Sequence, residues 1–295
     1  MLKSILIITY GRETELYETL KDVSAYSDED LEVLLLDNNE TDIRKEKIAK
    51  IFEKSKIKLR YFHDGKNYGV ALGRNYIIER SKGDILITLD DDIEIKNINL
   101  LLQRIEDYFK KMSEVGCLAF NIKNYYTRIA LRHEIPHGNK KLDFSQNLET
   151  YYFIGAGHAI RKKTYEECGK YPDDLGKYGG EEEDLSYRII EKYKIQYCAD
   201  LEIFHKISPN GRMRREEENY WRYRNKLIVR NRYLNKKSIT INWIIWSIYY
   251  FLVKKGKIKD ILKVKKEMKD METLSAERKE SILKKLKALN ARIIY

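Results

Sequence analysis

The sequence predicts an α/β fold, with a mostly parallel sheet covered by helices on both faces and a helical appendage at the C-terminus. Over residues 1–120, short apolar runs alternate with segments of helical periodicity, which is the succession that parallel sheets require. Polar residues follow four of these runs, at the strand ends where such sheets bind ligands. From residue 206 onward there are 25 Lys and Arg against 9 Asp and Glu, whereas residues 1–205 carry a net negative charge. This division predicts a compact domain followed by a basic segment that binds a surface.

The order of the elements follows from the spacing of the apolar residues. A short apolar run bounded by polar residues or glycine is typical of a buried strand, whereas apolar residues three and four positions apart indicate a helix. We therefore expect strands at 4–9, 31–36, 58–62, 84–89 and 115–120, and helices at 13–25, 42–54, 70–81 and 97–112.

Three consecutive carboxylates, Asp90, Asp91 and Asp92, end the predicted strand at 84–89. In an extended chain Asp90 and Asp92 point one way and Asp91 the other. Like charges this close repel each other unless a cation or hydrogen-bond donors compensate. A divalent metal, Mg²⁺ or Mn²⁺, explains the triplet, since both ions prefer oxygen ligands. An acidic turn that caps the following helix explains it equally well in isolation.

The other strand ends carry groups that suit a nucleotide. Tyr10 either forms an ordinary turn or stacks on a base, and Asp37 either caps a helix or accepts the imide N–H of uracil or thymine. Arg74 lies one turn into the helix that starts after Asn67. It is either a solvated surface residue or a residue that makes a bidentate contact to diphosphate. His63 ends a fourth strand. Four polar strand ends on one edge predict a site there.

A second acidic block follows two glycines, Gly179 and Gly180, and begins a helix that we expect to end near residue 193. Its acidic residues either stabilise the start of this helix or belong to a site. His205 ends a short predicted strand at 201–205 and is either structural or a metal ligand. The acidic residues are Glu181, Glu182, Glu183 and Asp184.

Four motifs together carry a resemblance to a known family. They are Ile-Thr-Tyr-Gly-Arg at 8–12, Leu-Leu-Asp-Asn-Asn at 35–39, the glycine-containing segment 67–75 and Leu-Asp-Asp-Asp at 89–92. In this order and spacing they resemble bacterial glycosyltransferase family 2, which has the GT-A fold. The resemblance covers most of residues 1–235. It implies a nucleotide-sugar-binding half at 1–120, an acceptor-binding half at 121–235 and a separate basic helical extension at 236–295.

The resemblance also implies a function and its residues. We expect an inverting, metal-dependent transferase that moves a sugar from a UDP-sugar, or a dTDP-sugar, to a hydroxyl of a glycan acceptor, lipid-linked or protein-linked, in surface polysaccharide biosynthesis. Asp92 and His205 would hold Mn²⁺ or Mg²⁺. Glu182 aligns with the family's catalytic Asp and would be the base, with Glu181 as the alternative and Asp184 in the same motif. The residues expected to bind the nucleotide-sugar are Thr9, Tyr10, Arg12, Asp37, Asn67, Arg74, Asp90 and Asp91.

The basic third contains an uncharged segment at 238–253 that would span about 24 Å as a helix, short of the ~30 Å bilayer core. Its aromatic residues and the lysines that follow predict a membrane surface contact through 238–259. A helix packed on the domain, or a homodimer through the C-terminal helices, is the alternative. With three scattered cysteines, the sequence predicts a cytoplasmic protein that is peripheral on the inner face of the cell membrane.

Other classes of protein fit less well. A hydrophobic content of 43% excludes a disordered chain. A calcium loop would need glycine where Ile95 stands, and a dinucleotide fingerprint would need it at Ile160. The basic and aromatic composition of 212–232 also suits nucleic acid, but no motif of that class is present, so we expect no nucleic-acid partner. A catalytically silent module that docks on a membrane is the remaining alternative.

Overall fold

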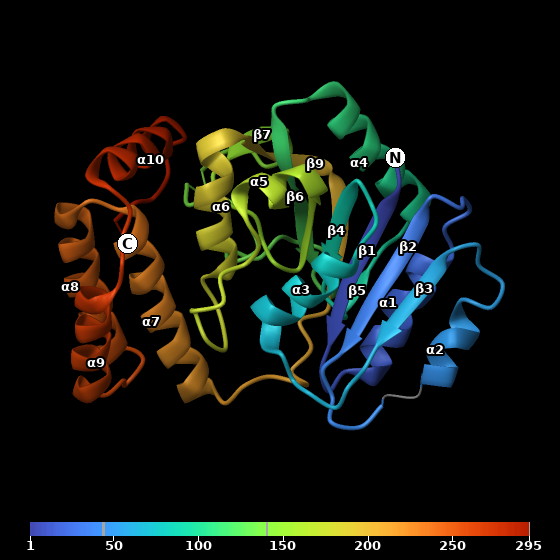
Figure 1. The fold of residues 1–295 in the computed structure, drawn as a ribbon, viewed down its shortest axis with the longest axis horizontal. Coiled ribbons are helices and arrows are strands. Elements are labelled where there is room, and N and C mark those ends of the chain that lie inside the picture. The colour runs from blue at the N-terminus through green and yellow to red at the C-terminus, as the bar shows by residue number, and fades with distance from the viewer. Residues whose placement is uncertain (43–44, 140, 295) are drawn as a thin grey trace.

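The computed structural model describes residues 1–42, 45–139 and 141–294. A central sheet forms the right-hand part of the molecule in Figure 1, and the C-terminal helices form the left-hand part. The strands are β1 (Lys3–Thr9), β2 (Leu31–Asp37), β3 (Lys58–Phe62), β4 (Ile85–Leu89), β5 (Ile93–Glu94), β6 (Val115–Asn124), β7 (Leu148–Thr150), β8 (Gly157–Arg161) and β9 (Lys194–His205).

The helices cover both faces of this sheet and continue beyond it. Among the described residues, the first six, up to α6, are interspersed with the strands, and the last four follow one another at the C-terminus. They are α1 (Glu13–Ser24), α2 (Lys45–Ile51), α3 (Gly69–Arg80), α4 (Ile98–Lys111), α5 (Lys162–Cys168), α6 (Glu181–Lys192), α7 (Arg215–Tyr233), α8 (Lys236–Leu252), α9 (Ile258–Asp270) and α10 (Ala276–Ala288).

The strand order is β3-β2-β1-β4-β8-β6-β9-β5, with β7 beside β9, among the residues that the structure describes. The first four strands run parallel, as predicted. The other half of the sheet is mixed, because β8 lies antiparallel between β4 and β6 while β6 and β9 pair in parallel. The crossover through α4 places β6 one position away from β4, and β8 fills the gap. The predicted α/β fold is therefore confirmed, with a mixed sheet in its second half.

Two hydrophobic clusters lie on the two faces of the sheet. On β1, Ile5 and Ile7 point into one cluster with α1 and α4, and Leu6 points into the other with α3, α6 and α7. This alternation is what a period of two residues per strand requires when both faces are covered. The parallel strands are thereby fixed at both faces, and their carboxyl ends form a rigid edge.

The predicted helices over residues 1–120 are confirmed with small changes at their ends. The helix expected at 42–54 is the shorter α2, and residues 43 and 44 of that prediction lie outside the described residues. The helical pattern at 260–290 forms two helices, α9 and α10, which are separated by residues 271–275. The side chains of Ile282 and Leu286 on α10 belong to the same hydrophobic cluster as Leu6. The C-terminal segment is therefore packed on the domain through α10.

Three aromatic residues of α8 face inward, whereas Phe251 is 44% exposed. Trp243, Trp246 and Tyr250 pack with residues of α7 and α9, and the Tyr250 ring stacks on Tyr223 with centroids 4.3 Å apart. Burial of large aromatic surfaces between helices is favourable. These three side chains, which the sequence predicted to lie at a membrane surface, therefore pack between helices instead. The aliphatic side chains on the opposite face of α8, such as Ile248, stay exposed. In the described residues, every helix is too short or too polar to cross a bilayer.

Candidate active site

A cavity of about 1540 Å³ opens at the carboxyl edge of the parallel strands. Its walls are formed by the ends of β1 and β4, the start of α3, the segment 151–156 and the start of α6. Helix α7 closes the side opposite the strands. This is the edge at which open α/β sheets bind their ligands. Tyr10, Asn67, Arg74 and Asp90 all line it, as do Glu181 and Glu182.

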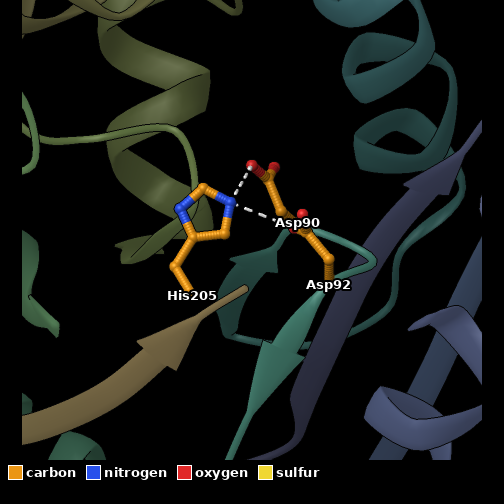
Figure 2. Close-up of side chains that lie close together, drawn as sticks. All are labelled: Asp90, Asp92 and His205. Carbon is orange, nitrogen blue, oxygen red and sulfur yellow. Dashed lines mark ion pairs between the residues drawn. The ribbon is translucent and has the colours of Figure 1, made fainter. Parts of the chain in front are cut away.

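Asp90, Asp92 and His205 converge at the edge of this cavity (Figure 2). The two carboxylates follow β4, and the imidazole comes from the end of β9, which is antiparallel to the short strand β5. The Nε2 atom of His205 lies 3.1 Å from Asp92 Oδ1 and 4.0 Å from Asp90 Oδ2. Asp92 is fully buried. One potential ligand atom from each residue lies within 4.8 Å of the others, so the three could share one ion.

The residues fit a divalent cation. Asp92 Oδ1 is buried and has no hydrogen-bond donor among the residues that the structure describes, although it is within ion-pair distance of the imidazole. The Nδ1 atom of His205 contacts Glu134 Oε1 at 2.5 Å, and this carboxylate directs Nε2 towards the aspartates. A buried carboxylate behind a histidine is the arrangement that orients metal-binding imidazoles. Carboxylate oxygens with one imidazole suit Mn²⁺ or Mg²⁺.

The charges at this cluster are strongly coupled. Burial lowers the pKa of His205, but the contacts with Asp92 and Glu134 raise it more, to about 10. Burial raises the pKa of Asp92, but His205 and Arg12 lower it more, to about 2. The cluster therefore holds one positive charge at the position where the carboxylates meet. A bound cation would replace this proton, as metal ions do at neutral pH.

Asp91 contacts residues at the end of β1 and just after it. Thr9 Oγ1 donates a hydrogen bond to Asp91 Oδ2 at 2.7 Å, and Arg12 Nη1 lies 2.9 Å from Oδ1. Arg12 Nη1 also lies 3.3 Å from Asp92 Oδ2. Burial and the charge of Asp92 raise the pKa of Asp91, which Arg12 opposes, to about 7. These residues tie the ends of β1 and β4 together.

Arg74 joins the metal cluster to the second acidic block. Its Nη1 atom lies 2.7 Å from Glu182 Oε1, and its Nη2 atom lies 3.4 Å from Asp90 Oδ1 and donates to the carbonyl of Gly155. The guanidinium is almost completely buried, and its Nε atom has no partner. A planar guanidinium with several donors suits such a bridge, which an ammonium group could not form. Arg74 therefore lies between the two predicted halves of the site.

The second acidic block starts α6 beside the cavity. Gly180 has φ +93°, and the amide of Asn225 on α7 donates to the carbonyls of Tyr178 and Gly179. Helix α7 thus holds the turn that directs Glu181 and Glu182 at the cavity. Burial and the neighbouring charge of Glu182 raise the pKa of Glu181 to about 8, against the effect of Arg74. Such a value suits a group that exchanges protons near neutral pH.

Besides the fully buried Asp92, two of the predicted site residues do not line the cavity. Asp37 is fully buried and accepts hydrogen bonds from Asn39 and from the hydroxyl of Tyr61 at 2.7 Å. Asp184 is buried on α6 and is paired with Arg188 at 3.0 Å and with Arg232. The structure therefore places Asp37 beneath the strand ends and Asp184 between α6 and α7.

Residues 4–169 match the family model of glycosyl transferase family 2, which is more than half of the chain. The chain belongs to glycosyl transferase family 2. A protein of Haemophilus influenzae named as uncharacterized is 56% identical over 170 residues, which cover 57% of this chain and 92% of that protein. Membership of the family makes the chain a glycosyltransferase.

Solved glycosyltransferase structures share the fold. Residues 1–349 of S. aureus TarS in complex with UDP-GlcNAc superpose with a TM-score of 0.64 at 14% identity, covering 98% of this chain and 84% of that one. The mannosyltransferase PcManGT of Pyrobaculum calidifontis, in complex with GDP-Man and Mn²⁺, gives a TM-score of 0.60 at 16% identity, covering 97% and 79%. At these identities the likeness shows a common GT-A fold.

Glu134 and Asn225 are parts of this candidate site that sequence reasoning missed. Glu134 lies in the irregular segment 121–150, where no periodicity indicates which side chains are buried. Asn225 lies in a segment rich in arginine and aromatic residues, and its position on α7 is clear only once Gly179 and Gly180 are placed against it. Gly179 and Gly180 were the only sequence feature that could have pointed to Asn225, because a sharp glycine turn needs a neighbouring surface to hold it in place.

Proposed function

We propose that this protein is an inverting, metal-dependent glycosyltransferase that moves a sugar from a nucleotide-diphospho-sugar to a hydroxyl of a glycan acceptor. The observation that carries the proposal is the bridge through Arg74, which joins Asp90 at the candidate metal cluster to Glu182 at the start of α6. Direct displacement at an anomeric carbon needs a group that stabilises the leaving diphosphate on one side and a base on the other. The two ends of this bridge supply them.

The donor half would bind the nucleotide-sugar at the strand ends. Asp92 and His205 would hold Mn²⁺ or Mg²⁺ with Asp90, and the bound cation offsets the charge of the departing nucleoside diphosphate. Tyr10 is 46% exposed at the cavity wall, which leaves its ring free to stack on a base. Asn67 lines the same wall and accepts a hydrogen bond from the Gly69 amide at the start of α3. These positions support a nucleoside diphosphate with its base near Tyr10.

Other predicted donor residues would act by holding these groups in place. Thr9 and Arg12 bind Asp91, and Arg12 also contacts Asp92, so they fix the acidic triplet. Asp37 binds the side-chain amide of Asn39, whose oxygen accepts a hydrogen bond from the amide of Gly11. A UDP-sugar is the preferred donor and a dTDP-sugar the alternative.

Glu182 would remove the proton from the acceptor hydroxyl, with Glu181 as the alternative base. Glu182 lines the cavity, and Arg74 fixes one of its carboxylate oxygens. Glu181 is more deeply buried, and its raised pKa would make it a strong base once it is ionised. Asp184 would anchor α6 to α7 through Arg188 and Arg232 rather than touch the substrate.

The acceptor would be a lipid-linked glycan, met at the surface of an anionic membrane. The outer face of α8 exposes Ile248, Leu252 and Val253, of which Leu252 is 67% exposed. Four lysines follow directly, at positions 254, 255, 257 and 259. Exposed aliphatic side chains beside lysines favour a bilayer interface with anionic lipid. Co-sedimentation of the protein with phosphatidylglycerol vesicles would support this membrane contact, provided that it is lost in Leu252→Glu and absent with phosphatidylcholine vesicles. Self-association of the protein through this face, without vesicle binding, would instead indicate a dimer interface.

A donor screen tests the proposed reaction. UDP-, dTDP- and GDP-sugars are incubated with the protein, and the released nucleoside diphosphate is measured with Mn²⁺, with Mg²⁺ and with EDTA. We expect release from one class of donor with either ion and loss of release with EDTA. Protection of the protein against thermal unfolding by a nucleotide, without release from any donor, would instead indicate a binding module.

A further inference from the structure

Helix α7 presents a row of cations to the cavity. Arg222, Lys226 and Arg230 are four residues apart, so they lie on one face of the helix, and all three line the cavity that contains Glu182. In Figure 1, α7 stands between α6 on one side and α8 and α9 on the other. This row therefore forms the wall of the cavity that is opposite the metal cluster.

The two arginines of this row have acidic or polar partners. Arg222 Nε lies 2.8 Å from Glu218 Oε1 on the same helix, and the arginine donates to the hydroxyl of Tyr178. Arg230 Nε lies 3.5 Å from Glu183 Oε1, and its guanidinium also binds Asn242. These contacts fix the ends of the row and neutralise the arginines locally.

Lys226, in the middle of the row, has no such partner. Within the described part of the chain, no carboxylate lies at ion-pair distance from its amine, which sits 4.2 Å from the ring centroid of Trp246. Burial and the charges of Arg230, Arg222 and Arg292 lower the pKa of Lys226 to about 8, although Glu183 opposes them. A half-buried cation among other cations is unfavourable unless an anion is brought to it.

The surroundings of Lys226 suit a sugar as well as an anion. Trp246 and Tyr249 line the cavity beside it, and flat aromatic faces stack on the C–H faces of sugar rings. A smaller adjoining hollow of about 350 Å³ is lined by Lys226, Lys254 and the same two aromatics. We call the set Arg222, Lys226, Arg230, Trp246 and Tyr249 the α7 subsite.

The α7 subsite is continuous with the reactive end of the cavity. Glu183, which pairs with Arg230, directly follows the proposed base Glu182 on α6. An acceptor whose hydroxyl reaches Glu182 would therefore extend its next units along α7. The acidic residues at the start of α6 repel an anion, whereas the α7 subsite attracts one, so the charge of an acceptor would also fix its direction.

We propose that the α7 subsite binds an anionic group, a phosphate or a carboxylate, on the sugar acceptor close to the hydroxyl that receives the transferred sugar. This inference rests on the proposed function, because it assigns the acceptor of that reaction. A packing role alone would be served by an apolar side chain at position 226, whereas the subsite places an ammonium group at the wall.

Binding of small probes tests the proposal with the donor site filled. The protein is first saturated with Mn²⁺ and whichever of UDP, dTDP or GDP protects it against thermal unfolding, so that phosphate cannot enter the donor site. Glucose 6-phosphate, methyl glucuronide and the neutral methyl glucoside are then titrated by calorimetry. We expect one or both anionic sugars to bind at least about tenfold more tightly than the neutral one, because charge-assisted contacts are the stronger ones. The two anionic arms distinguish a phosphate from a carboxylate.

Variants at position 226 separate charge from packing. Lys226→Met keeps the length of the side chain and should remove the preference for the anionic sugar, while Lys226→Arg should restore it. Lys266→Met, at an exposed position on α9, is the matched control and should bind like the wild type. Equal binding of anionic and neutral sugars, no binding of either anion, or an unchanged preference in Lys226→Met overturns the proposal. Failure of every nucleotide to protect the protein would instead count against the donor half of the proposed function.

Discussion

The two ends of the cavity differ in charge and in how they are built. The metal-cluster end gathers Asp90, Asp91, Asp92 and Glu134 at the ends of sheet strands and close beside them, where hydrogen bonds across the sheet fix the backbone. The α7 end gathers arginines and a lysine on one helix, and that helix is held by side-chain contacts to α6 and α8. The metal-cluster end therefore depends on the sheet, whereas the α7 end depends on how three helices pack.

Arg74 is where the two ends meet, so its removal should affect both. Arg74→Met leaves Asp90 and Glu182 without their shared cation and should lower the free energy of unfolding by about 3–5 kcal/mol, as breaking a buried ion pair does. Denaturant unfolding measures this loss. Arg80→Met, on the same helix but with a side chain 38% exposed, should cost much less. Equal losses in the two variants would show that Arg74 is not a buried bridge.

A substitution at Glu134 tests the metal-cluster end of the cavity independently of the α7 end. Glu134→Gln weakens the contact that orients His205 and should raise the Mn²⁺ concentration needed for nucleotide protection by about 10–100-fold. The readout is thermal protection by nucleotide over a series of Mn²⁺ concentrations. Glu149→Gln, at a partly exposed position on β7, is the control. Binding of anionic sugars at the α7 subsite should not change, and a loss of both kinds of binding would show that Glu134 supports the whole cavity.

Glu181 makes the acceptor end sensitive to pH. Its pKa is raised from the ordinary value near 4.5 to about 8, mainly by burial, so the folded state prefers the protonated form. The stability that this preference adds is fully present below about pH 4.5 and is lost as pH rises through 8. Glu181→Gln should therefore match the wild type at low pH and exceed it at pH 8–9 by on the order of 2 kcal/mol. Unfolding curves from pH 5 to 9 measure the difference, with the exposed Glu280→Gln as control; parallel curves would contradict the raised pKa.

Gly180 tests how much the acceptor end depends on the turn against α7. An alanine there would keep a left-handed φ of +93°, and its Cβ would approach Asn225 Cβ to 3.1 Å. We expect Gly180→Ala to lower the free energy of unfolding by about 1–2 kcal/mol and to reduce turnover. Nucleotide protection with Mn²⁺ should stay as in the wild type. A matching loss of nucleotide protection would mean that the two ends are not independent.

Much of the fold could be predicted because it is coded locally. The apolar runs at 4–9, 31–36 and 84–89 form β1, β2 and β4, since each is bounded by polar residues and alternates with a helical pattern. The position of β8 in the sheet and its antiparallel direction were not predicted. They depend on the gap that the α4 crossover leaves between β4 and β6. Strand position, unlike strand existence, is set by the whole sheet.

The candidate site could be predicted in part for the same reason. Asp90 and Asp92 follow β4 and His205 ends β9, so strand order brings them together although His205 lies more than 100 residues along the chain from the two aspartates. The burial of Asp37 and Asp184 could not be predicted, since carboxylates are buried only where particular partners, here Tyr61 and Arg232, come from distant segments. The inward face of α8 was equally hidden, because aromatic side chains suit a membrane surface and a helix interface alike.

The most direct test compares nucleotide binding and sugar transfer in Asp92→Asn and Glu182→Gln. We expect Asp92→Asn to lose Mn²⁺-dependent nucleotide protection. We expect Glu182→Gln to keep this protection while release of nucleotide from the donor sugar falls by about 10²–10⁴-fold, the usual contribution of a general base. Loss of protection in both variants, or turnover near wild type in Glu182→Gln, would contradict a site with a metal-binding donor end and a base at the start of α6.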